Sequence, residues 1–193
     1  MVSKEEIPKT ALLVCDLQNG IVQMMGDANK HVLTNTQKAI ETARKHNIPV
    51  IYIKVKFREG CPEVSPNNKM FSMISKMGNM VTDENMTEVH ESIKPKKEDI
   101  VVVKKRVSSF AGSDLEVILR SKGLTSLVLC GLSTSGVILS TVREAADKDF
   151  KLVVLSDCCA DTDDEVHNVL VKKVFARQAD VFTVDEWSSQ VDK

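Results

Sequence analysis

The sequence predicts a three-layer α/β/α sandwich built on a mostly parallel, Rossmann-like sheet of six strands. Short apolar runs recur along the chain, which is typical of strands buried on both faces. Amphipathic helical patterns separate most of these runs and indicate βαβ units, hence parallel strands. The 193 residues, 42% hydrophobic and 27% charged, suit one ordinary domain spanning residues 1–193.

Six segments have strand character. Five are nearly continuous apolar runs, and the sixth is weaker. In chain order they are Ala11–Cys15, Val50–Val55, Ile100–Val103, Ser126–Cys130, Leu152–Leu155 and Ala179–Thr183.

Helical patterns occupy several of the intervals. They cover Val32–His46, a helix from Ser113 to a stop at Gly123, Thr134–Lys148 and a stretch from Thr162. Ser113 with Glu116 and Thr162 with Glu165 have the spacing of capping boxes, which satisfy free backbone N–H groups at a helix start.

The least regular part is residues 57–84, where we expect a long excursion from the sheet. Four methionines recur in it at helical spacing: Met70, Met73, Met77 and Met80. They indicate either a short amphipathic helix packed on the core, or a flexible methionine-lined cap over a pocket or subunit contact.

Charge and cysteine content weigh against several classes of protein. Lys plus Arg total 26 and Asp plus Glu total 27, so a net charge of −1 predicts no nucleic-acid partner and no membrane anchor. The first residues, MVSKEEIPKT, lack an apolar signal region, and no apolar run reaches the roughly 18 residues of a membrane span. Five cysteines, an odd number, favour free thiols and a cytoplasmic location: Cys15, Cys61, Cys130, Cys158 and Cys159.

Candidate site residues lie where strands end, because open parallel sheets bind ligands beyond the carboxyl ends of their strands. Asp16 follows the first strand, Lys104 and Lys105 end the third, and Gly131–Ser135 lead from the fourth into a helix. We expect the first and third strands to be neighbours, with Asp16 within about 4 Å of Lys104. This arrangement suits either acid–base chemistry or a purely structural ion pair at the sheet edge.

Four ordered motifs connect these residues. Asp16–Asn19 read D-x-Q-N after an apolar strand, and Lys104–Phe110 read K-x-x-x-S-x-F. The third and fourth motifs comprise Gly131, Thr134, Thr141 and Ala145, then Asp157–Ala160 with His167. Together they resemble the isochorismatase-like hydrolases, or cysteine hydrolases, which include nicotinamidases, N-carbamoylsarcosine amidases and isochorismatases. The resemblance runs from Ala11 to about Trp187.

The resemblance implies roles for individual residues. Asp16 would be the general acid or base, and Lys104 would hold it ionised. Lys105 is the less favoured choice for this lysine, because the K-x-x-x-S-x-F motif places its lysine six residues before the phenylalanine and Phe110 lies six residues after Lys104. The oxyanion cradle would come from the backbone of Leu132, Ser133, Thr134 and Gly136, with a cis peptide bond between Leu132 and Ser133. Substrate contacts are expected from Gln18, Arg58 and Phe110.

The chain departs from the family at the nucleophile. Counted from Thr134, the position of the family's cysteine holds Val137, which has no thiol for a thioester route. The isochorismatases proper also lack this cysteine and protonate a vinyl ether, with the aspartate as acid. Cys130, Cys158 and Cys159 are expected to be buried hydrophobes rather than substitutes.

No metal and no other cofactor is expected. Nicotinamidases carry metal-binding histidines after the second strand, whereas Lys54–Glu59 contain none. His31, His46, His90 and His167 are scattered at helix-like positions, which favours solvated or capping roles.

Two functions remain open from the sequence. The favoured one is a metal-independent hydrolase of an unidentified small molecule, forming a homo-oligomer as members of the family do. The alternative is a catalytically silent binding or scaffold protein that retains the fold.

Overall fold

The computed structural model describes residues 9–26, 30–77 and 81–192. Six strands form one sheet in the order β3-β2-β1-β4-β5-β6, and each neighbouring pair is parallel. This confirms the predicted α/β class and makes the sheet parallel throughout. The strands are β1 (Thr10–Cys15), β2 (Val50–Val55), β3 (Ile100–Lys104), β4 (Ser126–Leu132), β5 (Lys151–Ala160) and β6 (Asp180–Phe182).

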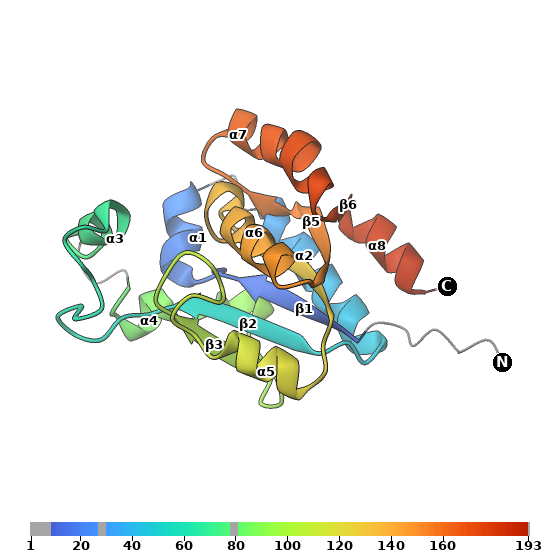
Figure 1. Cartoon of the computed structure of the whole chain (residues 1–193), viewed down its shortest axis with the longest axis horizontal. Helices are drawn as coiled ribbons and strands as arrows, with labels where there is room; N and C mark the ends of the chain where they lie inside the picture. The colour runs from blue at the N-terminus through green and yellow to red at the C-terminus, as the bar shows by residue number, and fades with distance from the viewer. Residues whose placement is uncertain (1–8, 27–29, 78–80, 193) are drawn as a thin grey trace.

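Helices cover both faces of the sheet and complete three layers (Figure 1). On one face lie α5 (Leu115–Ser121), α6 (Leu139–Asp147) and the turns η4 (Leu170–Val174) and η5 (Phe175–Arg177). On the other lie α1 (Asn19–Met25), α2 (Lys30–Lys45), η2 (Glu91–Ile93) and α8 (Val184–Val191). The remaining elements are α3 (Lys69–Ile74), α4 (Glu84–Thr87), η3 (Thr134–Ile138) and α7 (Asp164–Val169).

Strand β1 shows why the strands are recognisable in the sequence. Ala11, Leu13 and Cys15 belong to the core on the α5–α6 side, and Leu12 and Val14 to the core on the α2–α8 side. All five are at most 1% exposed. Because both faces are covered, the strand has no polar side and forms an uninterrupted apolar run.

The strand order corrects one expectation. Strands β1 and β3, which lead to Asp16 and Lys104, are not neighbours, because β2 lies between them. The chain extends the sheet from β1 through β2 to β3 on one side, then returns to β1 and continues through β4, β5 and β6 on the other. The carboxyl ends of all these strands nevertheless lie along one edge, since every pair is parallel.

Both predicted capping boxes are wrong. The carboxylate of Glu116 bonds to Lys148 Nζ at 2.6 Å, while Ser113 Oγ donates a hydrogen bond to a backbone carbonyl of its own loop. Helix α7 is capped by the carboxylate of Asp163, not by the hydroxyl of Thr162. Glu116 instead bonds to a residue distant in the sequence, and in α7 a neighbouring carboxylate caps the helix in place of the threonine.

Residues 57–77 and 81–84 leave the sheet, as expected, and carry α3, which stands to one side of it in Figure 1. This helix includes only the first two of the four methionines, Met70 and Met73, and Met80 lies outside the described residues. The side chain of Phe71 is 4% exposed and anchors α3 in a small core of its own. The methionines on the helix remain exposed.

Candidate active site

A cavity of about 270 Å³ opens at the carboxyl edge of the sheet. Five strands each supply a lining residue at or just beyond their ends: Asp16, Val55, Lys104, Leu132 and Asp161. Ligands bind at this edge in open parallel sheets, because the loops and helix starts there face a shared crevice.

Asp16 and Lys104 form a buried ion pair on the cavity wall. Lys104 Nζ lies 2.8 Å from Asp16 Oδ2, and the two side chains are 2% and 8% exposed. The same ammonium also donates to the carbonyls of Arg106 at 3.1 Å and Val107 at 2.7 Å. An ammonium has three N–H groups, so all the hydrogen-bonding capacity of Lys104 is used. The predicted contact between Asp16 and Lys104 is therefore present.

The other oxygen of this carboxylate is different. Asp16 Oδ1 is buried and has no hydrogen-bond partner. Burial raises the pKa of the Asp16 carboxyl above its ordinary value, against the opposing charge and hydrogen bond of Lys104. Asp16 also has a φ of 55°, in the left-handed region that costs energy for a residue other than glycine. The rest of the fold thus keeps Asp16 in place despite an unfavourable backbone conformation and a buried carboxylate oxygen without a partner.

Lys105 points away from the pair. Its ammonium donates to the carbonyl of Lys56 and lies 3.6 Å from Glu63. Consecutive residues of a strand end point to opposite sides, which separates it from Lys104. Of the two lysines, Lys104 is the one that lines the cavity and contacts Asp16.

The turn after β4 lines the same cavity. The peptide bond between Leu132 and Ser133 is cis, as expected. The backbone N–H of Gly136 bonds to the Ser133 carbonyl at 3.2 Å. The N–H of Ser135 donates at 2.7 Å to the carboxylate of Asp161, which itself lines the cavity. At least these two N–H groups therefore already have acceptors within the protein.

Val137 faces the same cavity and is 2% exposed. No cysteine lies among the described residues that line it. Burial raises the pKa of the Cys15 thiol, next to Asp16 in the chain, to about 12. Burial likewise raises the pKa values of Cys130, Cys158 and Cys159 above their ordinary range. These four thiols would carry very little thiolate near neutral pH, and the thiolate is the nucleophilic form.

The sequence motifs assign no site role to Asp161 or His167. Asp161 comes directly after β5, so the rule that ligands bind at the carboxyl ends of strands could have found it. His167 Nδ1 lies 2.8 Å from the hydroxyl of Thr134, which is fully buried behind the turn. Burial lowers the pKa of His167. No local pattern signals the contact between Thr134 and His167, because it joins two different helices.

Gln18 lies behind the cavity wall rather than in it. Its amide donates to the carbonyls of Val55 at 2.9 Å and Thr87 at 3.0 Å, and its oxygen accepts the N–H of Val55 at 2.8 Å. The side chain is 1% exposed, so no amide group remains for a ligand. Gln18 instead links the end of β2 to the end of α4 through these hydrogen bonds.

Arg58 and Phe110 are not brought to the cavity either. Arg58 pairs with Glu63 at 2.7 Å, and its side chain is 73% exposed. Phe110 is 7% exposed and packs in the core on the α5–α6 side, near the ring of Phe150. The described lining of this cavity thus includes none of Gln18, Arg58 and Phe110, from which substrate contacts are expected, since a sequence motif does not show which way a side chain points.

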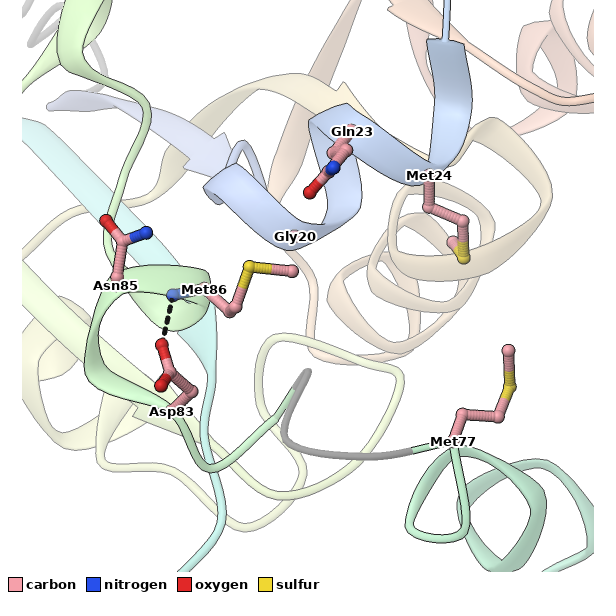
Figure 2. A pocket seen from close by; sticks show the side chains of 7 residues that line it. All are labelled: Gly20, Gln23, Met24, Met77, Asp83, Asn85 and Met86. Carbon is pink, nitrogen blue, oxygen red and sulfur yellow. Dashed lines mark hydrogen bonds between the residues drawn. The ribbon is translucent and has the colours of Figure 1, made fainter.

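A second, shallower hollow of about 560 Å³ lies beside the cavity. Figure 2 shows three methionines around it: Met24 from α1, Met86 from α4 and Met77 after α3. Met24 also lines the cavity, so the two spaces adjoin. The N–H of Met86 is bonded to the Asp83 carboxylate at 3.0 Å, which caps α4 and fixes this rim.

The part of the chain that the structure describes contains neither a cluster of metal-binding side chains nor a membrane-spanning helix. Within residues 9–26, 30–77 and 81–192, no three His, Cys, Asp or Glu side chains gather where a metal ion could be held. In the same part of the chain, no helix is long and apolar enough to cross a bilayer.

Comparisons with known proteins agree with this architecture. The crystal structure of a cysteine hydrolase from Pseudomonas syringae pv. phaseolicola 1448A matches with a TM-score of 0.88 over 99% of both chains, at 22% identity. The ureidoacrylate amidohydrolase RutB of Acinetobacter baylyi is 29% identical over 172 residues, which are 78% of this chain and 70% of that protein. An uncharacterized isochorismatase family protein of Bacillus subtilis, YwoC, is 31% identical over 186 residues, 96% of each chain. The model of the isochorismatase domain matches residues 10–186, and the chain therefore belongs to the isochorismatase family of hydrolases.

Proposed function

We propose that this protein hydrolyses a small molecule at the Asp16–Lys104 site without a cysteine nucleophile. The observation that carries the proposal is Asp16 Oδ1, a buried carboxylate oxygen with no partner on the wall of the cavity. Lys104 engages only the other oxygen, at 2.8 Å. An acid that is oriented on one side and unsatisfied on the other is suited to proton transfer.

Val137 stands where the family motif has its nucleophile. Its side chain lines the cavity, as a nucleophile would, but offers only two methyl groups. The buried thiols do not replace it, because burial raises their pKa values. Water is therefore the attacking group in the proposed reaction.

The steps follow from the state of Asp16. Burial raises its pKa, so this carboxylate takes up a proton more readily than an ordinary one does. The proton passes from Asp16 to the unsaturated carbon or the leaving heteroatom of the substrate, and the carboxylate that results is stabilised by Lys104. A water oxygen then bonds to the activated carbon, and one water proton returns to Asp16. The bond from carbon to the leaving group breaks, and where the first proton went to an unsaturated carbon, the leaving heteroatom takes the second water proton.

The test is turnover of a panel of small amides and vinyl ethers by wild type and by Asp16→Asn. We expect Asp16→Asn to lower kcat by at least about 100-fold, the usual contribution of a general acid. Asp83→Asn is the matched control, since Asp83 is an exposed cap of α4 and asparagine caps equally well. Turnover that survives in Asp16→Asn would refute the role of Asp16.

The alternative is a silent binding protein that retains the fold. It is favoured by one feature of the site: Lys104 has no N–H left, and the N–H of Ser135 is taken by Asp161. These are donors that an oxyanion would otherwise use. Saturable binding of a compound that wild type never converts would support this alternative.

A further inference from the structure

The charges on the cavity wall are the starting point. Among the described lining residues Lys104 is the one cation, and its three N–H groups are engaged by Asp16 and two carbonyls. Asp161 is the second carboxylate of the lining, and it has no ion-pair partner among the described residues. The described part of the lining therefore has negative charge to present to a ligand, but no free cation.

The turn after β4 strengthens this point. A helix start offers backbone N–H groups that normally receive an anion. Here the carboxylate of Asp161, only 7% exposed, accepts the N–H of Ser135 at 2.7 Å and that of Thr162 at 2.9 Å. The protein thus supplies its own anion at the place where an anionic ligand would bind.

The rest of the lining is largely apolar. Ile21 and Met25 come from α1, Met70 and Phe71 from α3, and Val81 from the segment after it. A volume of about 270 Å³ lies just below the usual range for ligand cavities, about 300–1,000 Å³. Both features suit a compact molecule with an apolar body.

We infer that this cavity selects a small, largely apolar molecule that carries no negative charge, either neutral or a single cation, with a hydrogen-bond donor directed at Asp161. The inference rests on the proposed function only in taking this cavity as the site. A ligand carboxylate would lie near Asp161 in a poorly solvated space, where like charges repel strongly. The hydroxyls of Ser133 and Ser135 both donate and accept, so they serve neutral groups as well.

Three probes of similar size test this charge rule, the exclusion of negatively charged ligands from the cavity. They are benzamide, benzylammonium and benzoate. We expect the first two to bind wild type in calorimetry or ligand-observed NMR, and benzoate to bind at least about tenfold more weakly. In Asp161→Asn benzoate should bind less than about threefold more weakly than the other two probes, because the charge of Asp161 is gone. Asp163→Asn is the matched control, since it removes a nearby exposed charge that does not line the cavity. In this variant benzoate should still bind at least about tenfold more weakly than the other two probes.

Each contrary result has a distinct meaning. Benzoate binding as tightly as benzamide, no binding of any probe at millimolar concentration, or an equal response of both variants would overturn the inference. Asp16-dependent hydrolysis of an anionic compound would sustain the proposed function and overturn the charge rule. Weaker binding of benzoate without hydrolysis of any compound tested would sustain the charge rule and count against the proposed hydrolase function.

Discussion

Lys104 Nζ reaches Asp16 Oδ2 at 2.8 Å although a whole strand, β2, separates their strands in the sheet. The long lysine side chain spans the end of β2 and leaves its ammonium 2% exposed. Two carbonyls of the loop after β3 complete its hydrogen bonds. The pair thus ties the centre of the sheet to its edge at the cavity wall.

Replacing Lys104 should destabilise the protein through Asp16. We expect Lys104→Met to lower the free energy of unfolding at pH 7 by about 3 kcal/mol, because a buried carboxylate would be left without its partner. Urea unfolding followed by circular dichroism measures this. Lys105→Met is the control, and its partly exposed side chain should cost less than about 1 kcal/mol.

The loss should also depend on pH. Burial already raises the pKa of Asp16 above 3.8, and removal of Lys104 raises it further. A group whose pKa is raised on folding contributes stability that is full below its unfolded pKa and is lost as pH rises through the folded pKa. The deficit of Lys104→Met should therefore grow from pH 4 to pH 7. A deficit that stays constant over this range would contradict the assignment.

Gly131 should tolerate no side chain. Its φ is 137°, and a Cβ built there would lie 1.9 Å from the carbonyl oxygen of Cys15 on the neighbouring strand. We expect Gly131→Ala to cost more than about 3 kcal/mol of unfolding free energy, because strands β1 and β4 would have to separate. Gly60→Ala is the control: its φ is 73° but the space around it is open, so only the backbone cost of about 1–2 kcal/mol applies. Similar losses in both variants would be inconsistent with this close approach.

Val137→Cys should gain a reactive thiol without amidase activity. Position 137 lines the cavity, so iodoacetamide should label it, as peptide mass spectrometry can show. Val142→Cys, on α6 in the core, is the control and should stay unlabelled. We expect no ammonia release from nicotinamide, because the N–H of Ser135 is already bonded to Asp161. Rapid ammonia release would mean that only the nucleophile is missing from an amidase pocket.

Exposed methionines near the cavity lead us to expect a homo-oligomer. Met73 and Met77 are 58% and 60% exposed, and Met77 borders the hollow of Figure 2. Light scattering at micromolar concentration should give a mass above that of one chain, and Met73→Glu with Met77→Glu should reduce it. Val117→Glu, on α5 and 71% exposed, is the control. A wild-type mass equal to that of one chain would contradict the prediction of a homo-oligomer.

Much of the sheet was determined by the sequence alone. The apolar run Val50–Val55 predicts the bounds of β2 as the structure has them, because a strand covered on both faces must be apolar along its length. The pairing of Asp16 with Lys104 followed from the rule that parallel strands end at one edge, together with the family motif. Helices α1 and α8 were missed, although α8 begins with a true capping box at Thr183 and Glu186. Short helices held by tertiary contacts carry a weak periodic signal.

Only the tertiary structure decided which side chains meet. The sequence could not show that β2 separates β1 from β3, because strand order depends on how crossovers pack and not on local pattern. Nor could it show that Glu116 pairs with Lys148, or that Asp161 takes the N–H of Ser135. Burial then set the state of Asp16, since the pKa of a carboxyl depends on the water and charges that the whole fold leaves around it.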